Sequence, residues 1–209
     1  MTAAGRAVPA VPAVTAGPAD AEALSQVIAV AFHDLAPSRW LIADPGERAR
    51  IFPGFFRILV DWALADGTVT TTPDRDAAAL WIPAGDEAPS PPADYPDRVA
   101  AVAGPWASRF EAFDATLEEH HPDGSPHEWL AIMGVRPGRQ GRGVGSALLS
   151  ARHRDLDREG RPAYLEAASP LARDLYLRHG YALQPGAPFR LPGGGPPMWP
   201  MLREARAAG

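Results

Sequence analysis

The spacing of hydrophobic side chains along the chain predicts helices that alternate with strands. Apolar residues recur three and four positions apart, the period of an amphipathic helix, in residues 20–32, 47–65, 98–119, 143–159 and 170–179. Short apolar runs bounded by turn residues predict strands at 68–72, 77–82, 129–135, 163–167, 181–183 and 198–202. We expect Asp20 to cap the first helix and Pro53 to interrupt or kink the second. This alternation indicates an α/β sandwich.

The chain length suits one domain, which we expect to span residues 13–206 after a disordered tail at residues 1–12. A chain of 209 residues is enough for one sizeable domain and marginal for two. The tail lacks the basic start and the long apolar core of a secretion signal. No stretch approaches the roughly 20 apolar residues that cross a bilayer. We therefore expect a cytoplasmic protein without a membrane partner.

The composition excludes several kinds of chemistry. The chain has no cysteine, so thiolate nucleophiles, disulfides and cysteine-ligated zinc are impossible. All 20 basic residues are arginine, which rules out a lysine Schiff base and a P-loop lysine. The net charge of -5 argues against a nucleic-acid partner. The same charge fits the attraction of a cationic substrate.

A glycine-rich turn, QGRGVGS at residues 140–146, lies between a predicted buried strand and an amphipathic helix. The free amides at the start of a helix, together with its dipole, favour a phosphate or pyrophosphate at this position. Arg139 and Arg142 can add charge at the rim. The spacing matches neither a P-loop nor a dinucleotide fingerprint. Taken alone, the glycines favour a helix-capping turn that binds nothing.

The blocks around this turn resemble the acetyl-CoA core of the GNAT superfamily of acetyltransferases. They are WLAIMGV, RPGRQGRGVG, YLEAASP and LYLRHGY, in that order. The flanking segments VTAGPADAEAL, AALWIPA, HHP and GPPMWPML are similar to puromycin N-acetyltransferase-like members. The resemblance implies an α/β fold with a mixed, mostly antiparallel central sheet, helices on both faces and a splay between the core strand and the next strand. It also implies transfer of an acetyl group from acetyl-CoA to a primary amine, by direct attack in a ternary complex.

The resemblance further implies roles for individual residues. The core strand would pair with the pantetheine arm and the turn would hold the pyrophosphate, which makes the cofactor-binding set Met133, Val135, Arg139, Gln140, Gly141, Arg142, Gly143, Val144, Gly145 and Ser146. Tyr176 occupies the position where these enzymes place a tyrosine near the coenzyme sulfur, and its phenol can protonate the departing thiolate. The alternative, from the residues alone, is that Tyr176 only packs a helix on the sheet.

Two departures from the family pattern leave the base open. Ala172 replaces the asparagine that often precedes the tyrosine by four residues, and Trp129 and Ala131 occupy positions where some members carry a basic group. Glu166, on the strand after the cofactor helix, is the candidate that could take the proton of an ammonium substrate. It could equally bind backbone amides where the strands part.

Four titratable residues gather before the core strand: His120, His121, His127 and Glu128. Because Pro122, Asp123 and Gly124 separate them, we expect a solvated loop, and no helical His-x-x-x-His spacing supports a metal. No metal cofactor is therefore expected, and a position near the substrate stays open.

The acceptor pocket of such a fold is built by the first helices, which makes Asp34, Trp40, Phe56 and Trp81 candidate wall residues. Aromatic residues at helical spacing are also typical of a core. The aromatic content favours a small-molecule amine over a protein N-terminus. A regulatory module that binds acyl-CoA without catalysis is the alternative of another class, and a homodimer stays possible.

Overall fold

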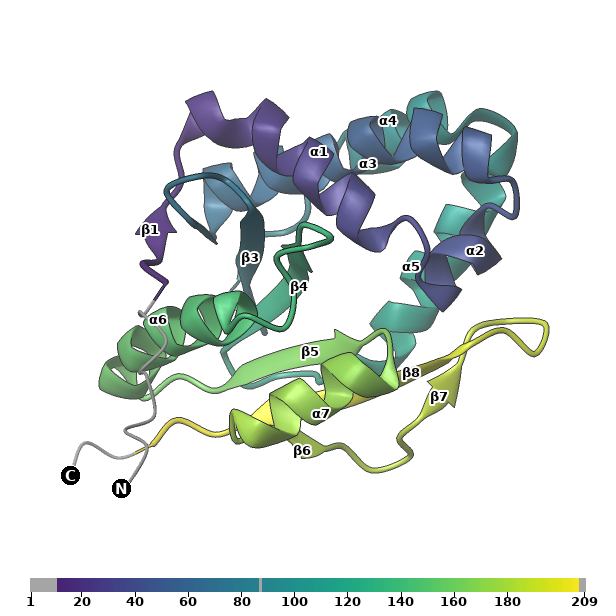
Figure 1. Cartoon of the computed structure of the whole chain (residues 1–209). Helices are drawn as coiled ribbons and strands as arrows, with labels where there is room; N and C mark the ends of the chain where they lie inside the picture. Colours follow the sequence, from purple (N-terminus) through teal and green to yellow (C-terminus); the bar gives the residue numbers. More distant parts are fainter. Residues whose placement is uncertain (1–10, 87, 207–209) are drawn as a thin grey trace, which may run out of the picture.

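The computed structural model describes residues 11–86 and 88–206 of the chain (Figure 1). Its helices are α1 Ala21–Phe32, α2 Ala36–Leu41, α3 Pro45–Asp66, α4 Tyr95–Ala103, α5 Ala107–His120, α6 Val144–Glu159 and α7 Pro170–Arg178, with 3-10 turns at Pro18–Asp20 and Gly104–Trp106. Its strands are β1 Val14–Thr15, β2 Thr68–Thr71, β3 Ala77–Ala84, β4 His127–Val135, β5 Ala163–Ala167, β6 Ala182–Leu183, β7 Phe189–Arg190 and β8 Pro197–Arg203.

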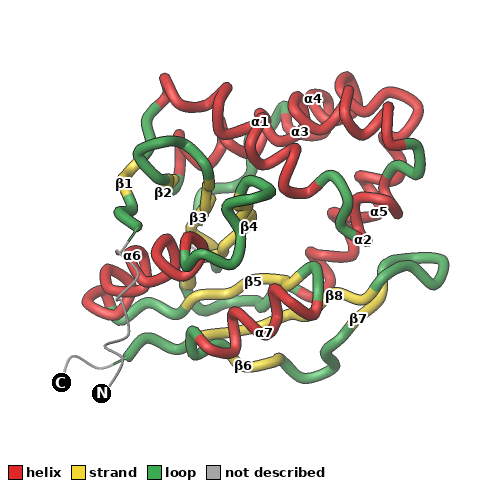
Figure 2. The backbone as a smooth tube through the Cα atoms, in the orientation of Figure 1, coloured by secondary structure: helices red, strands yellow, loops and turns green. Residues whose placement is uncertain are grey.

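The strands form a mixed sheet in the order β1-β2-β3-β4-β5-β8-β6, and β7 also pairs with β8. All neighbours are antiparallel except β4 and β5. These two strands pair only through Glu128 with Ala163 and Trp129 with Tyr164, so they part beyond that point (Figure 2). The mostly antiparallel sheet with a splay after the core strand is confirmed.

Helices cover both faces of this sheet. The alternate residues Ala78, Leu80 and Ile82 of β3 pack into one core with α1 and α3, which α4 and α5 extend. Ala77, Ala79 and Trp81 point the other way, into a second core with α6. In Figure 1, α6 and α7 lie in the lower part of the view, away from α1, α3 and α4. The period-2 alternation of β3 therefore serves two hydrophobic cores.

A β-bulge interrupts the pairing of β3 with β4. Leu80 lies opposite Ile132 and Trp81 lies opposite Leu130, so Ala131 is the extra residue. A bulge shifts the side-chain alternation by one residue. As a result Trp129, Ala131 and Ile132 all pack toward the core of α1 and α3, whereas Leu130 joins the core of α6. The bulge therefore changes which face of the sheet the later side chains of β4 occupy, in the part of the strand that no longer pairs with β5.

Several expected elements differ from the structure. The α3 helix continues through Pro53 instead of breaking there. Residues 98–119 form two helices, because Gly104 takes a positive φ and Pro105 follows it in a 3-10 turn. Asp20 does not cap α1; its carboxylate accepts from the amide of Gly17 and pairs with Arg75.

The expected tail at residues 1–12 lies outside the described residues except for Val11 and Pro12. Val11 packs against the core of α6, so ordered structure begins before residue 13. In the described ranges, no helix has the length and apolar character that crossing a membrane requires.

Candidate active site

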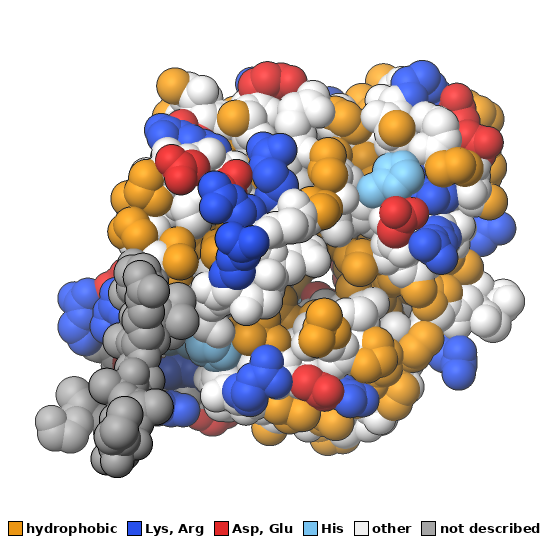
Figure 3. All heavy atoms as spheres, in the orientation of Figure 1, with side chains coloured by type: hydrophobic (Ala, Val, Ile, Leu, Met, Phe, Trp, Pro, Cys, Tyr) orange, Lys and Arg blue, Asp and Glu red, His pale blue; other side chains and the backbone are white. Residues whose placement is uncertain are grey.

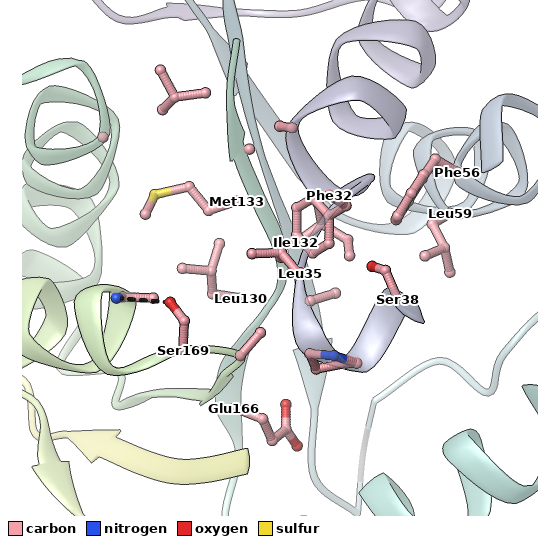
Figure 4. Close-up of a pocket in the computed structure, with 18 of the residues that line it drawn as sticks. Phe32, Leu35, Ser38, Phe56, Leu59, Leu130, Ile132, Met133, Glu166 and Ser169 are labelled. Carbon is pink, nitrogen blue, oxygen red and sulfur yellow. Dashed lines mark hydrogen bonds between the residues drawn. The ribbon is translucent and has the colours of Figure 1, made fainter. Parts of the chain in front are cut away.

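A cavity of about 550 Å³ opens where β4 and β5 part. Its wall runs without interruption from the glycine turn, past β4 and the start of α7, to α2, α3 and α5. The space-filling view shows a hollow at the middle of this face, bordered by hydrophobic side chains (Figure 3). In the close-up, Met133 and Leu130 point to one side of β4 and Phe32 and Ile132 to the other (Figure 4). One cavity therefore joins both faces of the sheet.

The glycine turn lines one end of this cavity. Gly141 and Gly143 have φ angles of 71° and 80°, a backbone region that residues with a side chain rarely adopt. Gly143 precedes α6 and provides no side-chain cap, so the amides of the first turn stay available to a ligand. The Ser146 hydroxyl lies 2.9 Å from Nε2 of His179, which anchors this first turn to the end of α7. The local geometry suits a pyrophosphate at the helix N-terminus.

Most of the predicted cofactor-binding residues line the cavity, but Arg142 does not. Met133, Val135, Arg139, Gln140, Gly141, Gly143, Val144, Gly145 and Ser146 line the cavity. Arg142 is exposed and does not line it. Arg139 lies in the wall, but its guanidinium pairs with Asp76 at 2.8 Å. The side-chain amide of Gln140 donates to the carbonyl of Val135, so that backbone group already has a partner. The donors that the turn offers to a ligand in the cavity are therefore backbone amides rather than these two guanidinium groups.

We expect Gly143→Ala to weaken acetyl-CoA binding about tenfold, because alanine at a left-handed φ strains the turn and displaces its amides. Calorimetric titration with acetyl-CoA measures this change. Gly160→Ala is the matched control, since Gly160 ends the same helix at a φ of 65° with open space around it and lies far from the turn. Equal affinities of the two variants would contradict the assignment of the anion site.

Tyr176 lines the cavity from α7 and is only 6% exposed. Its ring packs edge-on against Tyr181 with the centroids 5.6 Å apart. Burial raises the pKa of the Tyr176 phenol well above its usual value, because the phenolate would lose its hydration. The phenol therefore keeps its proton throughout the neutral range and is available as a donor.

Glu166 lines the same cavity from β5. Its side chain is 4% exposed, and Oε2 accepts from the indole nitrogen of Trp129 at 3.0 Å. The other oxygen, Oε1, is buried without a hydrogen-bond partner among the described residues. Figure 4 shows the Glu166 carboxylate below the short helix that carries Ser38. Contrary to the alternative interpretation, Glu166 does not bind backbone amides at the splay.

The sequence predicted a solvated loop for the titratable residues before β4, and this prediction is wrong for His127 and Glu128. His127 and Glu128 are buried, because they begin β4 beside β5. Nε2 of His121 lies 3.0 Å from Nε2 of His127, and Nδ1 of His121 lies 3.8 Å from Oε1 of Glu166. The histidine pair therefore adjoins the candidate base.

Hydrogen bonding determines the tautomers of this pair. Nδ1 of His127 lies 2.9 Å from the carbonyl of Ser125, which can only accept, so this nitrogen carries the proton. Burial lowers the pKa of His127, with a contribution from His121, so the ring is neutral and its Nε2 accepts from Nε2–H of His121. Nδ1 of His121 is then the ring nitrogen that faces Glu166, 3.8 Å from Oε1.

Of the four predicted wall residues, only Phe56 lines the cavity. Trp81 is fully buried on the opposite face of β3, against His153 of α6. Successive side chains of a strand point to opposite faces of the sheet, and Trp81 is one of those that face α6. Trp40 donates to the carbonyl of Pro192 and lies under the guanidinium of Arg109. Asp34 borders a separate hollow and pairs with Arg39 and Arg48. These three predictions are wrong as pocket walls.

Sequence reasoning missed an acidic residue in the wall. Asp114 lies on α5 between Phe110 and Leu117, at the spacing of the buried stripe, and that spacing is the signal that could have identified it. Its carboxylate accepts from the Tyr95 hydroxyl at 3.1 Å, and both residues line the cavity. Burial raises the pKa of Asp114 to about 6, despite the opposing hydrogen bond from Tyr95.

A sheet that parts beside a glycine turn, and a cavity that joins an anion site to a buried tyrosine and carboxylate, define an acyltransferase of the acyl-CoA-dependent kind. Residues 110–183 match the family model of the acetyltransferase (GNAT) domain. The match covers β4, the glycine turn, α6, β5 and α7, so this part of the chain carries a GNAT-type acetyltransferase domain. The protein is an acetyltransferase, the class of enzyme that takes its acetyl group from acetyl-CoA.

Solved structures of this superfamily share the fold over nearly the whole chain. Histone acetyltransferase HPA2 and related acetyltransferase from Corynebacterium glutamicum is 24% identical, with a TM-score of 0.67 over 95% of this chain and 98% of its own. Arylalkylamine N-acetyltransferase 2 from Aedes aegypti is 9% identical, with a TM-score of 0.61 over 94% and 99%. The NatC complex bound to Gag peptide and CoA is 9% identical, with a TM-score of 0.52 over 94% and 99%. At these identities the likeness shows the fold alone.

Proposed function

We propose that the protein transfers the acetyl group of acetyl-CoA to the primary amine of a small molecule with an apolar body. The observation that carries this proposal is the single cavity, which has the anion-binding turn at one end, Tyr176 and Glu166 within it, and an apolar chamber beyond. An enclosed chamber with few polar groups is the usual form of a small-molecule site.

The chemistry needs one bond to form and one to break. The amine nitrogen bonds to the carbonyl carbon of the thioester, and the carbon–sulfur bond breaks. Glu166 takes the proton that the ammonium must lose, since this residue lines the cavity and its Oε1 has no hydrogen-bond partner among the described residues. Tyr176 gives its phenolic proton to the departing thiolate. Direct attack is the simplest route, because the chain has no cysteine to carry an acyl group.

The walls of the acceptor chamber favour a small apolar amine over a peptide. They are aromatic and aliphatic side chains from α1, α3, α5 and the residue before α2: Phe32, Leu35, Phe52, Phe55, Phe56, Leu59, Trp62, Phe113 and Leu117. A peptide would need backbone hydrogen-bond partners along an open groove. The relatives of this fold include an arylalkylamine acetyltransferase and a peptide-bound complex, so the fold alone supports either acceptor.

The proton that Glu166 receives needs a way out of a dry cavity, and we propose that His121 provides it. Nδ1 of His121 lies 3.8 Å from Glu166 Oε1, and the side chain of His121 is 22% exposed, so the ring can exchange protons with water. In this scheme the proton moves from the ammonium to Glu166, then to His121 Nδ1, and then to solvent.

We expect His121→Asn to lower kcat about tenfold, because Glu166 then loses its proton more slowly between turnovers. We expect added imidazole to restore part of this loss. The measurement is kcat with and without imidazole. His120→Asn is the matched control, since the adjacent His120 stacks on Phe189 and its Nδ1 lies 2.9 Å from the Thr116 carbonyl. A kcat unchanged in His121→Asn, or a loss that imidazole does not relieve, would refute the relay.

The proposed function is tested by following CoA thiol release with a panel of primary amines of increasing apolar size. Each amine is paired with its tertiary N,N-dimethyl derivative, which cannot form a stable amide. We expect release with apolar primary amines and none with the tertiary partners. Binding of acetyl-CoA without release for any amine or peptide would favour the non-catalytic module instead.

A further inference from the structure

The acceptor chamber contains a second carboxylate that the transfer reaction does not use. Asp114 lines the chamber from α5, whereas Glu166 lines it from β5. Among the described side chains, the Asp114 carboxylate accepts one hydrogen bond, from the Tyr95 hydroxyl to Oδ2 at 3.1 Å. A carboxylate in an apolar wall is costly to keep unless a partner compensates it. One phenol satisfies one of its two oxygens.

A continuous aromatic wall connects the two carboxylates. Trp129 donates to Glu166 at one end, and Tyr95 donates to Asp114 at the other. Trp62 lies between them, with ring centroids 6.3 Å from Trp129 and 6.1 Å from Tyr95. All three rings line the cavity. The surface between the acidic groups therefore suits an aromatic or aliphatic body.

We propose that Asp114 is a specificity residue that binds a second cationic or hydrogen-bond-donating group at the far end of the acceptor. The substrate class is then a primary amine with an apolar body of one or two rings and a second polar group, best an ammonium, on the opposite end. The amine that is acetylated lies at Glu166, and the second group lies at Asp114. This inference rests on the proposed function and deepens it.

The electrostatics of the chamber fit this assignment. Above about pH 7 the Asp114 carboxylate is mostly ionised, because burial raises its pKa only to about 6. A cation that enters the chamber loses water and regains an ion pair in a site of low dielectric, where charge-assisted hydrogen bonds are strong. Tyr95 keeps the carboxylate in place from α4. An apolar end group would leave the carboxylate without that compensation.

The test compares two acceptors of the same shape. Para-xylylenediamine ends in an ammonium where para-ethylbenzylamine ends in a methyl group, and the corresponding biphenyl pair probes the longer body. The measured quantity is the ratio of kcat/KM for the diamine to that for the monoamine, after correction for the two equivalent amines. We expect this ratio to exceed one by about tenfold for at least one body length, which corresponds to about 1.4 kcal/mol.

Two variants link the preference to Asp114. In Asp114→Asn, which keeps the shape and still accepts from Tyr95, we expect the ratio to fall to about one. In Tyr95→Phe we expect an intermediate ratio, because the carboxylate loses its positioning contact. Glu111→Gln, an exposed change one turn earlier on α5, should leave the ratio as it is.

The outcomes separate this inference from the function beneath it. Turnover of the monoamines with a ratio near one in the wild type would refute the role of Asp114 and leave the transferase standing. A ratio that Asp114→Asn does not change, including an equal loss on both substrates, would also refute it. If no amine releases CoA, the proposed function itself fails.

Discussion

Replacing Glu166 by glutamine should lower kcat/KM for the amine at neutral pH by about a hundredfold or more, the usual contribution of a general base. Glutamine has the shape of glutamate and its carbonyl oxygen can still accept from Trp129 Nε1, so the wall should keep its structure. The variant lacks a group that removes the ammonium proton, and only free amine from solution can react.

The pH profile distinguishes this chemical loss from a structural one. Below the amine pKa, which is about 10 for an alkylamine, the free-amine fraction rises tenfold per pH unit, so the variant should recover as the pH increases. Acetyl-CoA affinity, measured by calorimetry, should not change. The control is Glu119→Gln on the exposed side of α5. A Glu166→Gln enzyme with wild-type kcat/KM, or with a uniform loss at every pH, would assign the base elsewhere.

Replacing Tyr176 by phenylalanine should lower kcat by about a hundredfold while acetyl-CoA still binds. The substitution removes only the hydroxyl, and the ring keeps its edge-on contact with Tyr181. Because burial raises the pKa of Tyr176, the phenol is protonated across the working range, and no loss of activity from its ionisation is expected below about pH 10.

Tyr181→Phe provides the matched comparison for this variant. Tyr181 is similarly buried beside Tyr176, but its hydroxyl lies 3.1 Å from Nε2 of His153, away from the cavity wall. Its loss should affect stability more than kcat. Equal kcat values for Tyr176→Phe and the wild type would show that the phenol only packs α7 on the sheet.

Much of the fold was predictable because its hydrophobic patterns are strong and local. The apolar run of β4 and the stripe of α6 bracket the glycine turn, and both elements lie within a residue or two of their predicted ends. The failures occurred where local chemistry has two solutions. A proline within a helical pattern can end the helix or be accommodated inside it, as Pro53 is in α3. A Gly-Pro pair can divide one helical pattern into two helices, as at Gly104.

The cofactor end of the site was more predictable than the acceptor end. The turn is local in sequence, so the spacing of the glycines was enough to predict its place between β4 and α6. The acceptor chamber is lined by side chains from five different helices. The sequence also does not show which face of β3 is on the side of this chamber. Trp81 therefore seemed a wall residue although its parity directs it to α6. Conversely, the link from Glu166 to His121 bridges 45 residues of sequence and depends on the splay of the strands.

The central claim is that one cavity brings an acetyl donor and an amine together for direct transfer. The most direct test is to incubate the protein with isotopically labelled acetyl-CoA and an apolar primary amine, and to locate the label by mass spectrometry of both the amine and the protein. The account predicts label on the amine nitrogen, one CoA released per acetylated product, and none on the protein. Label that stays in protein-bound acetyl-CoA, or that accumulates covalently on the protein, would contradict it.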